Sequence, residues 1–214
     1  MTRKPGNGLF ITFEGIDGCG KSTQARRLAT SLRSRGEPVL LTREPGGSTG
    51  AEDIRSLLVK GDPDRWWPET ELLLFTAARF DHFRKVIGPA RAKGTTVICD
   101  RFTDSTRVYQ GCARGGLRRL VDTLHEQLGI SEPDLTILID LAPEQAMARS
   151  LESQPLETRF EDFGVAFQGR MRDAFHQLAR EFDDRIHVVN GDLAADSLAQ
   201  HVEAIVENCR GPSA

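Results

Sequence analysis

Residues 9–35 have the sequence LFITFEGIDGCGKSTQARRLATSLRSR, and this stretch decides the fold. Residues 9–13 form a short apolar run, which is typical of a strand buried on both faces of a parallel sheet. Residues 21–35 carry apolar side chains at helical spacing on one stripe, and Gly36 can end that helix. A strand, a glycine-rich turn and a helix in this order predict the first unit of an α/β sheet.

The turn between strand and helix is Gly15-Ile16-Asp17-Gly18-Cys19-Gly20-Lys21-Ser22, which matches the pattern G-x-x-x-x-G-K-[ST] in full. Glycines allow a backbone to curl closely around phosphate oxygens, and the N–H groups at a helix N-terminus attract the anion. We expect Lys21 to neutralise the β- and γ-phosphates and the Ser22 hydroxyl to bind magnesium. A chance glycine-rich turn is the alternative, and the flanking strand and helix argue against it.

The rest of the chain repeats the alternation of strands and helices. Further apolar runs of strand length occupy residues 39–42, 95–99, 135–141 and 186–189. Helical patterns occupy residues 52–60, 69–92, 117–128, 143–151, 163–182 and 196–208. We therefore predict an α/β fold of the P-loop NTPase type, with a five-stranded parallel sheet flanked by helices and one domain over residues 1–214. Residues 1–7 are expected to be disordered-like, and residues 153–158 predict a mobile loop between two helices.

The composition narrows the possible function classes. The chain has 28 basic and 31 acidic residues and a net charge of −3, which argues against a nucleic-acid partner. Its four cysteines form no C-x-x-C pair, so we expect neither a disulfide framework nor a zinc site, and a reducing cytoplasmic location. No secretory signal and no apolar run of about 18 residues is present, so we expect no membrane partner.

Polar residues that follow the predicted strands are candidates for binding a second substrate. The base-reading pattern N-K-x-D of GTPases is absent, so the remaining motifs must name the reaction. Asp100 and Arg101 end the strand at residues 95–99, where ligands bind in open α/β sheets. The carboxylate of Asp100 could hold magnesium and the guanidinium of Arg101 could bridge phosphates. A strand-end ion pair explains the same two residues equally well.

Four weaker candidates lie elsewhere in the chain. The segment Thr42-Arg43-Glu44-Pro45-Gly46-Gly47 follows the second strand, either as a simple turn or as backbone placed against a ligand. Arg55 lies one short helix further on and could reach back to a phosphate, although a solvated arginine on the helix surface is the simpler explanation. Phe75 and Arg79 are four residues apart and share a helix face, either as a base-stacking pair or as a core and a surface residue. Residues 104–111 are rich in hydroxyls and end in Tyr109-Gln110-Gly111, which suits either a ligand or a helix cap.

Taken together, these segments closely resemble bacterial thymidylate kinases. The resemblance rests on residues 13–23, 42–47, 100–101, 109–111, 133–136, 138–141 and 143–144, and it runs in order from about residue 9 to residue 190. It implies transfer of the γ-phosphoryl group of ATP to dTMP, giving dTDP and ADP for DNA precursor synthesis. ATP is then the phosphoryl donor, Mg²⁺ the metal, and a homodimer formed through helix packing the expected assembly.

The resemblance also implies a role for individual residues of the acceptor site. Phe75 would stack on thymine, Arg79 would hydrogen-bond the base edge, and Thr106 and Gln110 would help to distinguish the base. Tyr109 would lie against the deoxyribose and disfavour a ribose. The remaining implied contacts are Asp17 to the sugar 3′-hydroxyl, Arg55 and Arg101 to the dTMP phosphate, and Glu44 and Pro45 to the same pocket.

The expected lid, at about residues 142–160, departs from the family pattern. Bacterial members usually carry several basic residues there when the phosphate loop has no arginine, yet this lid has only Arg149 and Arg159. Arg159 is the candidate for reaching the transferred phosphate, and Arg149 for the adenine or the ATP phosphates. Two alternatives remain, namely a related kinase with another nucleoside or nucleotide acceptor, and a catalytically silent nucleotide-binding module.

Overall fold

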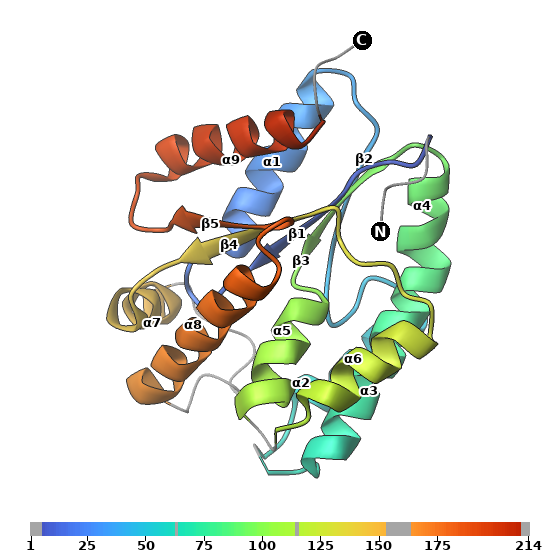
Figure 1. Cartoon of the computed structure of the whole chain (residues 1–214), viewed down its shortest axis with the longest axis vertical. Helices are drawn as coiled ribbons and strands as arrows, with labels where there is room; N and C mark the ends of the chain where they lie inside the picture. Colours follow the sequence, from blue (N-terminus) through green and yellow to red (C-terminus); the bar gives the residue numbers. More distant parts are fainter. Residues whose placement is uncertain (1–5, 63, 114–115, 153–163, 211–214) are drawn as a thin grey trace.

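Five strands form one parallel sheet in a computed structural model that describes residues 6–62, 64–113, 116–152 and 164–210 (Figure 1). The strands are β1 (Phe10–Glu14), β2 (Val39–Arg43), β3 (Thr96–Asp100), β4 (Leu135–Asp140) and β5 (Ile186–Asn190). Their order in the sheet is β2-β3-β1-β4-β5, and every neighbouring pair is parallel. The predicted five-stranded parallel sheet and all five predicted strands are confirmed.

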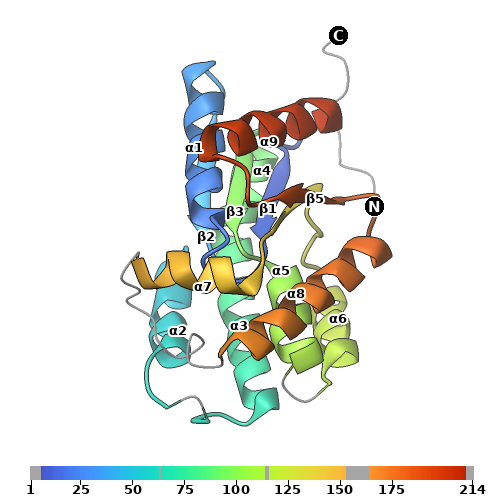
Figure 2. The same ribbon diagram turned by 90° about the vertical axis from the view of Figure 1, so that its left-hand side faces the viewer.

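The apolar strands lie where both faces of the sheet are covered by helices. All five residues of β1 are buried, and β1 pairs with β3 on one side and β4 on the other. Helices α1 (Lys21–Ser34) and α9 (Ala195–Arg210) contact each other over one face (Figure 2). Helices α4 (Gly88–Ala92) and α8 (Gly164–Glu181) pack against β3 and β4. Burial on both faces explains the continuous apolar runs of the central strands β1, β3 and β4, whereas the edge strands β2 and β5 are partly exposed.

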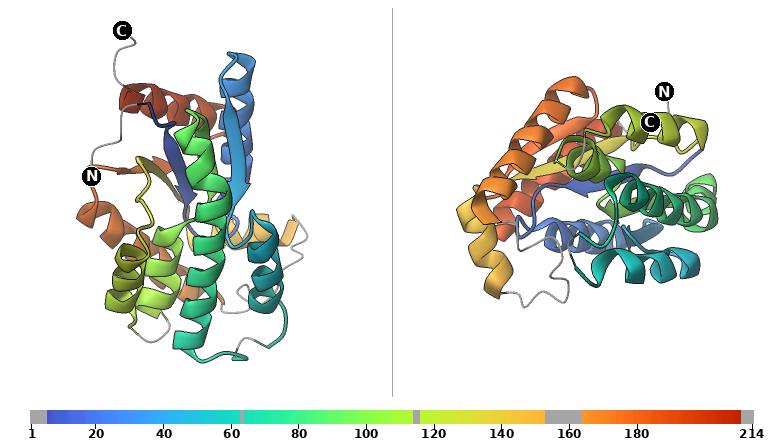
Figure 3. Two further views of the ribbon diagram at one scale, coloured as in Figure 1. Left: turned by 90° about the vertical axis from the view of Figure 1, so that its right-hand side faces the viewer. Right: turned by 90° about the horizontal axis from the view of Figure 1, so that it is seen from below.

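The predicted helix at residues 69–92 consists of three segments in one continuous column (Figure 3). Helix α3 (Pro68–His82) leads into a π-helical turn (Phe83–Ile87) and then into α4. The regular hydrogen bonding changes just before Pro89, which has no backbone N–H to donate to the preceding turn. The extent of this helix is therefore confirmed, and the π-helical turn is the difference from the expectation.

The remaining helices position the site. They are α2 (Thr49–Val59), α5 (Thr103–Val108) with a π-helical continuation (Tyr109–Ala113), α6 (Arg118–Gln127) and α7 (Pro143–Glu152). Trp66 is half-buried and donates from its indole nitrogen to the Leu57 carbonyl at 3.2 Å, whereas Trp67 is 80% exposed at the start of α3. Trp66 therefore anchors this segment to the end of α2, whereas Trp67 lies on the surface.

Several expectations fall on residues outside the described ranges. These are the mobile loop at residues 153–158, the catalytic candidate Arg159, most of the disordered-like start and the later part of the lid. The first part of the expected lid is α7. Within the described ranges, no helix combines the length and the apolar character that crossing a membrane requires.

Candidate active site

A cavity of about 940 Å³ opens at the carboxyl edge of the sheet. Parallel strands all end at this edge, so residues that follow different strands converge there. The predicted site residues that line the cavity are Asp17, Gly18, Cys19, Gly20, Lys21, Ser22, Glu44, Pro45, Arg55, Phe75, Arg79, Asp100, Arg101, Thr106, Tyr109, Gln110 and Arg149. Gly15 and Ile16 lie beside them in the phosphate loop and are buried. The structure therefore brings together every described residue that the sequence nominates, and their roles remain predictions.

The phosphate loop is held so tightly that two of its glycines have no room for a side chain. A Cβ at Gly18 would lie 1.9 Å from the Ala146 carbonyl oxygen, and one at Gly15 would lie 2.6 Å from that of Ile139. Gly20, with φ of 102°, has nothing within 4 Å of such a Cβ. The loop is thus packed on its protein side and open at Gly20, which suits close approach of phosphate oxygens.

The residues nominated for magnesium are in contact with each other. The Ser22 hydroxyl, at the start of α1, donates a hydrogen bond to the Asp100 carboxylate at the end of β3. Among the described residues, no group of three or more His, Cys, Asp or Glu side chains could enclose a metal ion. Magnesium prefers oxygen ligands and usually takes only one or two from the protein, with the rest from water and phosphate. Ser22 and Asp100 therefore fit this ion.

Arg101 is fixed between the phosphate loop and α5. Its backbone has φ of 67°, the only positive value at a non-glycine residue in the described chain. Its guanidinium donates to the Gly15 carbonyl at 3.2 Å, to the Ser105 hydroxyl at 2.9 Å and to the Asp17 carboxylate. Burial acts to raise the pKa of Asp17, but the positive charges of Arg101 and Lys21 outweigh it and hold that pKa below its ordinary value. Asp17 and Arg101 therefore both remain charged at the mouth of the phosphate loop.

Glu14 belongs to this arrangement, although the sequence analysis does not single it out. Its carboxylate is buried and accepts hydrogen bonds from the Phe102 backbone N–H at 2.7 Å and from the Ser105 hydroxyl at 2.6 Å. Burial, with a further contribution from Asp104, raises the pKa of Glu14 to about 7. The signal in the sequence is a carboxylate that ends an otherwise apolar strand directly before the phosphate loop.

At the far end of the cavity, Arg79 is held by a chain of buried side chains. Its Nε donates to Glu44 Oε2 at 2.7 Å, and its Nη2 donates to Thr106 Oγ1 at 2.7 Å. His82 Nδ1 lies 3.2 Å from Glu44 Oε1, so this nitrogen carries the proton that the carboxylate accepts. His82 Nε2 lies 2.8 Å from the Thr42 hydroxyl. The conformation of the turn after β2 thus fixes the guanidinium of Arg79.

Gln110 also lines the cavity and is paired with Glu71, a second residue that sequence reasoning missed. Gln110 Nε2 donates to Glu71 Oε1 at 2.9 Å, and both side chains are buried. Glu71 precedes Phe75 by four residues and Arg79 by eight, so all three share one face of α3. That spacing is the signal that could have found Glu71.

Arg55 and Tyr109 also line the cavity. Arg55, on α2, donates to the carbonyl of Pro45, which follows a cis peptide bond. Tyr109 donates from its hydroxyl to Asp17 Oδ2 at 3.4 Å, and the guanidinium of Arg101 lies 5.4 Å from the centre of its ring. Burial, strengthened by the charge of Asp17, raises the pKa of Tyr109, so its hydroxyl remains a donor.

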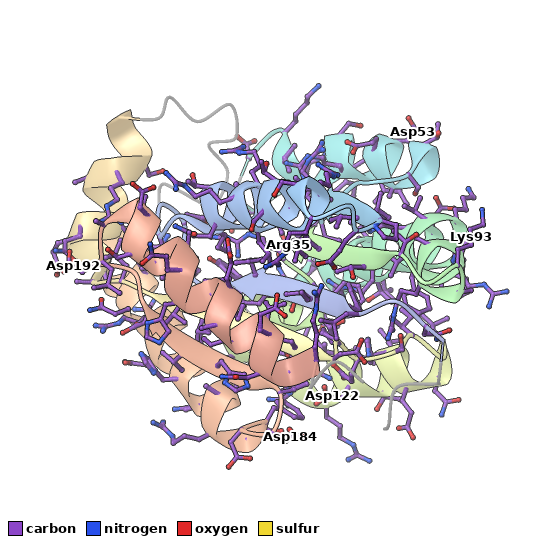
Figure 4. The ribbon with its side chains drawn as sticks, turned by 90° about the horizontal axis from the view of Figure 1, so that it is seen from above. Arg35, Asp53, Lys93, Asp122, Asp184 and Asp192 are labelled. Carbon is purple, nitrogen blue, oxygen red and sulfur yellow. The ribbon has the colours of Figure 1, made fainter. Side chains whose placement is uncertain are left out.

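The opposite end of the cavity is formed by a loop that the sequence analysis does not nominate. Residues 191–195, after β5, line the cavity together with Arg149 from α7. Arg149 donates to the Gly191 carbonyl at 3.0 Å, and Gln145 Nε2 donates to Asp192 Oδ1 at 3.0 Å. Figure 4 shows Asp192 beside α7 at the flank of the molecule. This loop carries no recognisable motif, and only its position after a strand end indicates a site.

Comparison with known proteins agrees with this geometry. The family model described as "Thymidylate kinase" matches residues 13–202. A thymidylate kinase of Ruegeria pomeroyi is 59% identical over 94% of this chain and 95% of its own length, and one of Caulobacter vibrioides is 47% identical over 93% and 96%.

A solved structure extends the comparison from sequence to fold. The crystal structure of thymidylate kinase from Ehrlichia chaffeensis is similar with a TM-score of 0.76 and 35% identity, over 94% of this chain and 99% of that one. The resemblance inferred from the motifs is thereby confirmed. The chain belongs to the thymidylate kinase family.

Proposed function

We propose that this chain transfers the γ-phosphoryl group of ATP, with Mg²⁺, to dTMP and releases ADP and dTDP. The observation that carries the proposal is a single cavity in which the phosphate loop and Arg101 lie between two different ends. One end is the Arg149 side with residues 191–195, which suits the donor nucleotide. The other is the Arg79 and Gln110 side, which suits the acceptor base.

The acceptor roles are proposals that the contacts support. Phe75 is half-buried on the cavity wall, as a base-stacking residue should be. Arg79 and Gln110 face the base edge with Thr106, and Glu44 holds Arg79. The remaining acceptor contacts would come from Asp17 and Tyr109 to the sugar, from Arg55 and Arg101 to the phosphate, and from Pro45 to the pocket wall.

The chemistry requires positioning and charge neutralisation more than acid–base catalysis. The acceptor phosphate already offers an oxygen nucleophile, so the protein must align it in line with the donor and offset the charge on the transferred group. Lys21 and Arg101 supply fixed positive charge at the loop, and Arg159 remains a candidate for a third. Mg²⁺, held by Ser22 and Asp100, would spread the negative charge of the donor phosphates.

We also propose a cytoplasmic homodimer. Leu73 on α3 is 53% exposed and Trp67, directly before this helix, is 80% exposed, so this region offers apolar surface for packing against a second copy. All four cysteines are free thiols, which is consistent with a reducing compartment. Sedimentation equilibrium tests the assembly, and a mass of 23.7 kDa at micromolar concentration would contradict a dimer.

A coupled assay of ADP release tests the activity. The acceptors to compare are dTMP, dUMP, dCMP, dGMP and thymidine, each with ATP and Mg²⁺. We expect dTMP to be the best acceptor and release to require it. A different preferred acceptor would support the related-kinase alternative, and ATP binding without dTMP-dependent release would support the silent nucleotide-binding module.

A further inference from the structure

The pair formed by Glu71 and Gln110 fixes which polar atom Gln110 presents to the cavity. The Glu71 side chain is fully buried in α3, and its Oε1 lies 2.9 Å from Gln110 Nε2. A carboxylate offers only acceptors, so the amide must turn its NH₂ group toward Glu71. The carbonyl oxygen Oε1 of Gln110 is therefore directed away from Glu71.

Arg79, which also lines the cavity, is likewise held in one orientation by its hydrogen bonds. Its Nε is committed to Glu44, and its Nη2 to Thr106 Oγ1 and the Phe102 carbonyl at 3.3 Å. Within the described part of the chain, neither Arg79 Nη1 nor Gln110 Oε1 makes a hydrogen bond, and neither atom is sealed from solvent. Because both side chains line the cavity, Arg79 offers a donor group and Gln110 an acceptor to a ligand there.

This donor and acceptor match only one class of pyrimidine edge. Thymine and uracil offer a carbonyl oxygen, O4, beside a ring N3–H donor. Cytosine offers the reverse, an exocyclic amino donor beside an N3 acceptor. A cytosine in the same position would set its amino group against the guanidinium of Arg79 and its N3 against Gln110 Oε1, which leaves polar groups mispaired on both sides.

We propose that Glu71 is a specificity-determining positioning residue, which selects a 4-oxo pyrimidine nucleotide by holding the Gln110 amide in the orientation that presents its oxygen. This proposal rests on the proposed function, since it concerns the base of the same acceptor. Glu71 itself need not touch the substrate. It acts through Gln110, in the way that Glu44 acts through Arg79.

The substitution Glu71→Gln tests this role with little change of shape. An amide at position 71 can donate or accept, so it no longer imposes one orientation on Gln110. We expect the ratio of kcat/KM for dTMP to that for dCMP to fall by at least tenfold, chiefly through KM. The ratio for dTMP to dUMP should be unchanged, because both bases carry N3–H. Glu69→Gln, an exposed position two residues earlier in α3, is the matched control and should leave both ratios unchanged.

The double variant Glu71→Gln/Gln110→Glu provides an independent test. It exchanges the amide and the carboxylate, preserves the net charge of the pair, and leaves a carboxylate oxygen as the acceptor facing the cavity. We expect it to retain the preference for dTMP over dCMP even where Glu71→Gln alone does not fold. Equal loss of dTMP and dCMP activity in Glu71→Gln would show a merely structural role, and that result, or loss of the preference in a folded double variant, would overturn the proposal.

The wild-type protein separates this proposal from the proposed function. If the unmodified chain fails to phosphorylate dTMP, the proposed function is wrong. If it phosphorylates dTMP while the dTMP to dCMP ratio is the same in the Glu71→Gln variant, only the role of Glu71 is wrong.

Discussion

The carboxylate of Glu14, at the end of β1, accepts a hydrogen bond from the backbone N–H of Phe102 at 2.7 Å. Phe102 follows β3, so this contact joins the ends of two neighbouring strands just where one leads into the phosphate loop and the other into Arg101. The left-handed backbone of Arg101 costs about 1 kcal/mol, and the buried hydrogen bond helps to maintain it. Glu14 therefore supports the geometry of both segments that are proposed to bind phosphate.

The raised pKa of Glu14 predicts a pH dependence of stability. Its pKa of about 7 in the folded state lies above the ordinary value of 4.5, so the folded protein binds this proton more tightly. The resulting stabilisation is complete below pH 4.5 and is lost as the pH rises through 7. Relative to Glu14→Gln, the wild-type free energy of unfolding should fall between pH 5 and pH 8 by on the order of 3 kcal/mol. Urea denaturation at both values tests this, and a pH-independent difference would contradict it.

Lys21→Ala and Arg101→Ala should nearly abolish turnover without unfolding the chain. Each removes fixed positive charge from the proposed site of the transferred phosphoryl group, and losing one such contact costs about 100-fold or more in kcat. The melting temperature should change by only a few degrees. Lys93→Ala is the control, since Lys93 is exposed at the end of α4 on the flank away from Asp192 (Figure 4). Near-normal kcat in either variant would refute the assigned role.

Asp104 is predicted to be essential for stability. Its buried carboxylate accepts from Arg107 Nη1 at 2.8 Å and from Arg185 Nη1 at 2.7 Å. Asp104→Asn leaves two buried guanidinium groups with less compensating charge, so the free energy of unfolding should fall by about 3–5 kcal/mol. Asp122→Asn changes a carboxylate that also pairs with Arg107 but is 40% exposed, and it should cost about 1 kcal/mol or less. Similar losses for the two variants in urea denaturation would contradict this prediction.

Gly47→Ala should weaken dTMP binding as well as stability. A Cβ there would lie 2.3 Å from His82 Nε2 and 2.6 Å from Thr42 Oγ1, so it would displace the histidine that holds Glu44. Gly36→Ala is the control, because Gly36 has a similar φ of 80° but nothing within 4 Å of the added atom.

Both alanines bear the strain of a left-handed backbone, about 1 kcal/mol. Gly47→Ala should lower the stability more than Gly36→Ala and should raise the KM for dTMP. Both differences should come only from the contact of the added Cβ with His82 and Thr42. Equal melting temperatures for the two variants, with an unchanged KM, would show that His82 adapts without consequence.

The sequence alone was sufficient for the features that depend on local pattern. The phosphate loop could be predicted because its glycines, Lys21 and Ser22 act within one short turn between a strand and a helix. The parallel sheet could be predicted because strands covered on both faces must be apolar throughout. The convergence of Arg79, Asp100 and Arg101 could be predicted because parallel strands end at a common edge, and because the motifs are distinctive of a family.

Only the tertiary structure decided how those side chains are oriented. Glu14 meets Phe102 across 88 residues of chain, His82 meets Glu44 across 38, and Glu71 meets Gln110 across 39. A buried carboxylate has no local pattern that names its partner, since the partner is whichever donor the fold brings to it, and the cost of leaving either group unsatisfied then fixes the geometry. The residue types that form the site are therefore written in the chain, whereas the direction in which the Gln110 amide points is determined by packing.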